Sequence, residues 1–151
     1  MARIIILSNL PVEMEEKELL ERKRAIQFIT RHGYSGISEK RVFDLLAEQN
    51  RKHEHVKLIK AMDKELGQTT LLNQLLVTTT RQNLLFELID RQHKLQFILG
   101  DQDTIWPLPR VSYYLNGLEG VSVNIIEGCG HMSPIERPKE VAKFIADFLS
   151  E

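Results

Sequence analysis

The spacing of hydrophobic positions changes several times along this 151-residue chain. "RIIIL" at residues 3–7 is a continuous apolar run rich in β-branched side chains, which is typical of a strand buried on both faces of a parallel sheet. Two later runs, "KLQFILG" at 94–100 and "VSVNIIEG" at 121–128, predict two more strands. The pattern therefore predicts about three strands.

The segments between these strands have the spacing of amphipathic helices, with apolar residues every three or four positions. Four helices are predicted before the second strand, in "EEKELLERKRAIQFITRHG", "SEKRVFDLLAEQN", "HEHVKLIKAMDKELG" and "TTLLNQLLVTTTRQ". Gly33 and Gly67 are suitable helix stops, and Ser38 is a suitable N-cap. We also expect a helix at 109–118 and an amphipathic C-terminal helix with Pro138 in its first turn.

This order of elements predicts the α/β fold class. Strand–helix–strand units favour a parallel sheet with right-handed crossovers, flanked by helices. We therefore expect an α/β core formed by residues 1–10 and 82–151, interrupted by an all-helical insertion of residues 11–81.

Composition narrows the class of protein. The chain is 42% hydrophobic and 27% charged, as expected for a globular domain, and its net charge of −1 gives no electrostatic reason to bind nucleic acid or a membrane. Cys129 is the only cysteine, so an intramolecular disulfide is impossible and a reducing compartment is favoured. The apolar run near the N-terminus is too short for a signal peptide or a membrane span. We expect a cytoplasmic protein.

Two polar turns follow the second and third predicted strands. "FILGDQD" at 97–103 ends in Asp103, and "EGCGHMSPIERP" at 127–138 contains His131. Turns after adjacent parallel strands lie at the same sheet edge, so the two side chains could meet there. From the spacing alone, an unpaired turn aspartate and an unpaired loop histidine are the simpler interpretation. A histidine whose one nitrogen is fixed by a carboxylate can act as a general base through its other nitrogen.

These motifs resemble the C-terminal half of the α/β-hydrolase-fold family. Residues 94–103 resemble its seventh strand with the triad acid, and residues 121–138 resemble its eighth strand, histidine loop and last helix. Residues 12–81 resemble its cap, and residues 3–7 its sixth strand. The resemblance implies a partial α/β-hydrolase fold.

What the family does with these motifs gives the expected chemistry. The resemblance implies that Asp103 and His131 are the acid and the histidine of a catalytic triad. The family acts by acyl transfer on esters, amides and related bonds, so we expect no cofactor and no metal.

The nucleophile is where the chain departs from the family. The family's G-x-S-x-G elbow follows its fifth strand, and this chain contains no such motif. Cys129 is intrinsically nucleophilic, but neighbouring loop residues tend to point apart, so it need not face His131. Ser8 ends the first strand and should lie at the same edge, although a strand-end hydroxyl is the simpler interpretation. Ser35 follows a helix and fits a loop cap.

Other candidates have both a functional and a structural interpretation. Trp106 and Met132 are the candidate substrate-binding residues, although Trp106 could equally pack under the cap and Met132 suits core packing. Glu136 suits the N-terminal dipole of the last helix. His53 and His55 point to different faces of a helix, so they do not form a metal site.

Three functional hypotheses follow. In the first, the chain is the C-terminal half of a serine hydrolase and is inactive without a partner that carries the serine. In the second, it is a non-catalytic, self-associating protein that binds an apolar ligand. In the third, it is an independent enzyme that uses Cys129 or Ser8.

In the first two cases one edge of the first strand lacks a neighbouring strand; its residues are Ile4, Ile5, Ile6 and Leu7. We therefore expect a homodimer, or a complex with a polypeptide carrying the missing N-terminal half.

Overall fold

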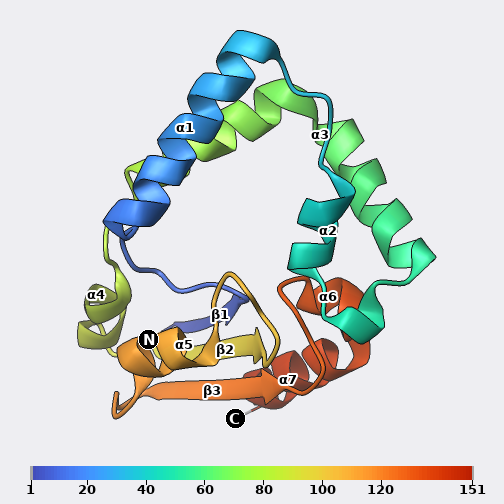
Figure 1. The fold of residues 1–151 in the computed structure, drawn as a ribbon. Helices are drawn as coiled ribbons and strands as arrows, with labels where there is room; N and C mark the ends of the chain where they lie inside the picture. The colour runs from blue at the N-terminus through green and yellow to red at the C-terminus, as the bar shows by residue number, and fades with distance from the viewer. Residues whose placement is uncertain (1, 151) are drawn as a thin grey trace.

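The computed structural model describes residues 2–150, which contain one parallel sheet of three strands. The strands, hydrogen-bonded in this order, are β1 (Arg3–Leu7), β2 (Lys94–Gly100) and β3 (Val121–Ile126) (Figure 1). All three strands lie where the sequence predicted them, and their parallel arrangement confirms the α/β class. β2 is central, and every residue after Lys94 in it is buried.

Helices cover both faces of the sheet. On one face lie α4 (Leu85–Asp90) and α5 (Leu108–Leu115), and on the other lies α7 (Pro138–Ser150). The odd-numbered residues of β2 point toward α4 and α5, because side chains alternate along a strand. Ile98 points the other way, into a cluster with Ile126, Cys129 and Val141.

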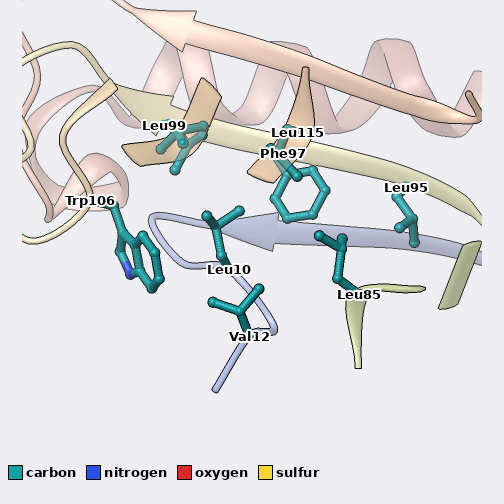
Figure 2. Close-up of a cluster of buried hydrophobic side chains, with 9 residues drawn as sticks. Leu10, Val12, Leu85, Leu95, Phe97, Leu99, Trp106 and Leu115 are labelled. Carbon is teal, nitrogen blue, oxygen red and sulfur yellow. The ribbon is translucent and has the colours of Figure 1, made fainter. Parts of the chain in front are cut away.

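The larger core cluster lies between β2 and the helices α4 and α5 (Figure 2). Its buried members are Leu10, Val12, Leu85, Leu95, Phe97, Leu99, Trp106, Val111 and Leu115. Each large aliphatic or aromatic side chain contributes roughly 1.5–3 kcal/mol when fully buried. This cluster therefore fixes the position of the carboxyl end of β2. The turn that contains Asp103, which we call the acid turn, begins there.

Between β1 and α4, residues 11–81 form the segment that we call the helical insertion. Its helices are α1 (Glu16–His32), α2 (Glu39–Leu45), the short 3-10 helix η1 (Glu48–Asn50) and α3 (His53–Thr79). They form an arch over the sheet: α1 lies on one side and α2 on the other, and α3 runs beside both of them, with its bend near the top (Figure 1). The Ser38 hydroxyl accepts a hydrogen bond from the Arg41 N–H and caps α2, as expected.

Gly67 bends α3 rather than ending it. The backbone there has φ of 68° and ψ of −179°, a conformation that glycine adopts readily, and it separates two straight helical halves. The sequence therefore predicted the break correctly.

Two short helices differ from the sequence expectation. Neither α4 nor α6 (Ser133–Glu136) was predicted, because segments of 6 and 4 residues are too short to show a helical hydrophobic repeat. The helix predicted at 109–118 ends earlier, at Leu115, since Asn116 has extended backbone angles and Gly117 has a φ of 78°.

β1 has a strand on one side only among residues 2–150. It pairs with β2 from Arg3 to Leu7, and these β1 side chains stay partly exposed. Ile5 and Leu7 lean toward α7, whereas Ile4 and Ile6 lean toward the larger core cluster. β1 is therefore one of the two edge strands of the sheet, and β3 is the other.

Candidate active site

Asp103 lies in the turn that follows β2, and its carboxylate is fixed in one orientation. Its Oδ1 accepts hydrogen bonds from the backbone N–H groups of Ile105 (2.8 Å) and Trp106 (3.0 Å). Its side chain is fully buried. The two backbone bonds leave Oδ2 to point toward the turn after β3.

His131 lies in that turn, and its ring nitrogen Nδ1 contacts the free carboxylate oxygen of Asp103. Its Nδ1 is 2.8 Å from Asp103 Oδ2, and its backbone N–H donates to Leu45 O of the helical insertion at 2.9 Å. The side chain is 24% exposed, and Nε2 has no hydrogen-bond partner among residues 2–150. An imidazole held through Nδ1 with Nε2 free has the geometry of a general base. The two residues thus meet where the sequence predicted.

The acid turn and the histidine loop (residues 128–132) are hydrogen-bonded to each other. Asp101 Oδ1 accepts from the Cys129 N–H at 3.1 Å, and the Gln102 N–H donates to Cys129 O at 2.9 Å. At Gly100 an added Cβ would lie 2.1 Å from Cys129 O, so only glycine allows this close approach. The distance between Asp103 and His131 is therefore set by backbone contacts.

Glu136 accepts hydrogen bonds from the same loop, a role that was not predicted from the sequence. It is 5% exposed, and its carboxylate accepts hydrogen bonds from four N–H donors. The donors are the backbone N–H groups of Ala47, Gly130 and Met132 and the side-chain amide of Asn50. The signal available in the sequence was an acidic residue six positions after a glycine of the histidine loop.

Cys129 does not face the pair. Its side chain is fully buried in the core cluster with Ile98, Ile126 and Val141. Burial, and secondarily the negative charge of Glu136, raise the pKa of the Cys129 thiol to about 12. The thiolate is the nucleophilic form, so this environment does not favour a catalytic cysteine.

Ser8 lies at the expected end of the sheet, but its hydroxyl is engaged elsewhere. It is 5% exposed, has a φ of 47°, and its Oγ lies 3.2 Å from the Oγ of Ser133. No hydrogen bond joins Ser8 to His131 within residues 2–150. Ser35 lies in the loop between α1 and α2, within the helical insertion.

The two predicted substrate-binding residues both take part in packing. Trp106 is 2% exposed within the larger core cluster, its Nε1–H donates to Asn9 Oδ1, and the Arg110 guanidinium lies 4.1 Å from its ring centre. This burial favours the packing alternative for Trp106. Met132 is half-buried against the cluster of Val42, Leu46 and Ile59, and its contact with a substrate stays a prediction.

Residues 2–150 were searched for a metal-binding cluster and for a membrane-spanning helix. Within residues 2–150, no group of three or more His, Cys, Asp or Glu side chains is arranged to hold a metal ion. Over the same range, no helix combines the length and the apolar character needed to cross a membrane.

Comparison with solved structures identifies the fold. The thermophilic esterase from Thermogutta terrifontis superposes with a TM-score of 0.83 at 20% identity, over 97% of this chain and 54% of that one. The enol-lactonase from Burkholderia xenovorans LB400 superposes with a TM-score of 0.81 at 13% identity, over 100% of this chain and 57% of that one. The chain thus spans a little over half the length of these structures.

Curated relatives match a shorter stretch. Monoacylglycerol lipase abhd6-B of Xenopus laevis is 40% identical over 55 residues, which are 36% of this chain and 16% of that protein. Monoacylglycerol lipase ABHD6 of Mus musculus is 34% identical over a stretch of the same length. No protein-family model matches the chain.

The sheet order, the flanking helices and these superpositions define the class: the chain has a partial α/β-hydrolase fold, corresponding to the C-terminal half. Among the proteins that it resembles are an esterase and monoacylglycerol lipases.

Proposed function

We propose that this chain is the C-terminal half of an α/β-hydrolase-type serine hydrolase that cleaves ester or amide bonds. It supplies the general base His131, the orienting acid Asp103 and a helical cap formed by residues 11–81. The serine nucleophile and the oxyanion hole come from a polypeptide segment outside these 151 residues. The chain alone is therefore inactive.

One observation carries this proposal: the 2.8 Å contact between His131 Nδ1 and Asp103 Oδ2, with Nε2 free. A buried aspartate that is also held by two backbone N–H groups has no freedom to turn away from the imidazole. Packing alone does not require a histidine that is partly exposed and fixed on one nitrogen only. A general base requires both features.

The reaction then follows from the two nitrogens. Nε2 takes the proton from the serine hydroxyl as its oxygen attacks the carbonyl carbon of the substrate. The resulting imidazolium is stabilised by Asp103 through Nδ1–H, and it returns the proton to the leaving group. A water molecule, activated in the same way, then hydrolyses the acyl-enzyme. Oxyanion donors are worth about 10²–10³ in rate, so their absence alone would leave the isolated chain nearly inactive.

The outer edge of β1 is the proposed attachment point for the missing half. Ile4, Ile5, Ile6 and Leu7 remain partly exposed, and the backbone of an unpaired apolar edge strand tends to pair with another chain. Addition of a strand there would pair the outer N–H and C=O groups of β1. A two-fold dimer through the same edge is the alternative arrangement. Light scattering at micromolar concentration separates both from a monomer.

A serine-directed probe tests the function. The chain is purified natively with its bound polypeptides and treated with a fluorophosphonate, in parallel with the purified chain alone. We expect labelling of a serine on a bound polypeptide, turnover of nitrophenyl esters and of monoacylglycerols by the complex, and loss of both on His131→Ala. No label on any complex would support a non-catalytic protein instead. Labelling of the chain alone at Ser8 would contradict the division between two polypeptides.

A further inference from the structure

Glu136 is a buried carboxylate that the proposed chemistry does not use. No salt bridge to it occurs among residues 2–150, and the groups that contact its carboxylate directly are N–H donors. The Arg137 guanidinium lies one step further away and donates to Asn50 Oδ1 at 3.3 Å. Burying an unpaired charge is costly unless several hydrogen bonds satisfy it. A neutral side chain would fill this space with a smaller desolvation penalty. The reason for a charged side chain here is therefore sought in the N–H groups that it binds.

The donors come from two parts of the molecule that are distant in sequence. Gly130 and Met132, the residues on either side of His131, donate to Glu136 at 3.0 and 3.1 Å. Ala47 and Asn50 of the helical insertion donate to Oε2, each at 2.9 Å. One carboxylate thus binds the histidine loop and the helical insertion at the same time.

Neighbouring contacts reinforce this connection. The Asn50 side-chain amide also donates to Gly128 O at 2.9 Å, and His131 N–H donates to Leu45 O at 2.9 Å. At Gly130 an added Cβ would lie 2.6 Å from Ala47 N, which shows how closely the two backbones approach. The histidine loop therefore follows any displacement of residues 45–50.

We propose that Glu136 is a positioning residue, which fixes the histidine loop to residues 45–50 and so sets the orientation of His131 toward Asp103. Through this contact, the position of the helical insertion controls how well the imidazole is aligned. This inference rests on the proposed function, because alignment matters only if His131 transfers a proton. It adds a coupling between cap and base.

The first test uses the isolated chain and needs no serine. A histidine N–H that donates to a buried carboxylate gives a proton resonance far downfield of the amide region, and His131→Ala assigns it. Glu136→Gln keeps the size of the side chain but places an NH₂ group against N–H donors. We expect the resonance to broaden or move upfield in a chain that remains folded by circular dichroism. Glu140→Gln, an exposed change in α7, should leave it unchanged.

The second test uses the reconstituted complex of the chain with its serine-bearing polypeptide. For Glu136→Gln we expect kcat to fall by roughly 10- to 100-fold, the scale of a small misplacement of a catalytic group, with KM nearly unchanged. A purely structural role would lower the melting temperature but would leave the resonance and kcat unchanged, and that result would overturn the proposal. If Glu136→Gln does not fold, Asn50→Ala removes one of the four donors to Glu136, together with the bonds of Asn50 to Gly128 and Arg137, and should shift the same resonance less.

The two tests also separate this inference from the proposed function. Absence of the downfield resonance in the unaltered chain would count against the His131–Asp103 pair itself. A normal resonance that Glu136→Gln leaves in place would count against the positioning role alone.

Discussion

The helical insertion is attached to the α/β core at two junctions with opposite chemistry. At the ionic junction, Arg110 of α5 contacts Glu15 (3.0 Å) and Glu18 (3.3 Å) at the start of the insertion, and all three side chains are 21–57% exposed. At the buried junction, Glu136 accepts hydrogen bonds from residues of the insertion and of the histidine loop. The ionic junction is connected to Asp103, because Arg110 stacks on Trp106 and the Trp106 N–H donates to Asp103. The buried junction contacts the two residues that flank His131.

The difference in burial shows why substitution of a charged residue should have different effects at the two junctions. Exposed ion pairs gain little net energy, because water screens the charges and two long side chains lose freedom. A buried carboxylate contributes little net energy when satisfied, but removing it leaves several N–H groups without acceptors. The ionic junction can therefore be adjusted gradually, whereas the buried junction fails abruptly.

The largest effect is expected for Glu136→Ala. This change leaves the N–H groups of Ala47, Gly130 and Met132 without their acceptor, so the free energy of unfolding should fall by about 3 kcal/mol. Urea denaturation measures it, with the exposed Glu140→Ala as control. Equal, small losses for both variants would remove the distinction between the junctions.

Gly130→Ala should come next. The added methyl group would lie 2.6 Å from Ala47 N and 2.8 Å from Leu45 O, and backbone atoms cannot move aside easily. We expect a loss of about 2 kcal/mol by overpacking, measured by thermal unfolding. Gly117→Ala is the matched control: it meets no atom within 4 Å, but its φ of 78° should cost about 1 kcal/mol. If the control costs more, crowding at the buried junction is unimportant.

At the ionic junction, Arg110→Ala should lower stability by about 1 kcal/mol, the sum of weak ion pairs and the stacking of the guanidinium on Trp106. Arg110→Lys should recover only part of this loss, because an ammonium group lacks the planar stacking surface. Chemical denaturation of the three proteins side by side measures both values. Full recovery by lysine would mean that charge alone matters here.

The smallest effect concerns salt. Raising NaCl from low concentration to about 0.5 M should reduce the stability difference between the unaltered chain and Arg110→Ala by a few tenths of a kcal/mol. The difference for Glu136→Ala should stay constant, because buried groups are poorly screened. Urea denaturation at the two salt concentrations gives both differences. An equal salt response at both junctions would contradict the contrast drawn between them.

Sequence reasoning reached the two candidate residues because their motifs resemble those of the α/β-hydrolase-fold family. Asp103 and His131 each follow a recognisable strand, and parallel strands bring their carboxyl ends to one edge. The short helices α4 and α6 were missed because so few residues show no period. Trp106 had two equal interpretations, and only its 2% exposure favours the core.

Glu136 shows the limit most clearly. In the sequence it is an acidic residue before a proline at the start of a helix, where the helix dipole gives a sufficient reason for its presence. Its four donors come from residues 47, 50, 130 and 132, and no spacing rule connects the first two with the last two. The same holds for Cys129, whose burial in the core cluster with Ile98 and Val141 depends on how the loop turns.

The sequence by itself determined the α/β class, the three strands, the break at Gly67 and the pairing of Asp103 with His131. The first three depend on hydrophobic period or backbone freedom, which act over a few residues. The pairing was expected from the resemblance of the two motifs to a known family. The tertiary structure alone decided how the helical insertion meets the histidine loop and which carboxylate holds it there. Those contacts join residues more than 80 positions apart, and hydrogen bonds of that kind leave no periodic trace in the chain.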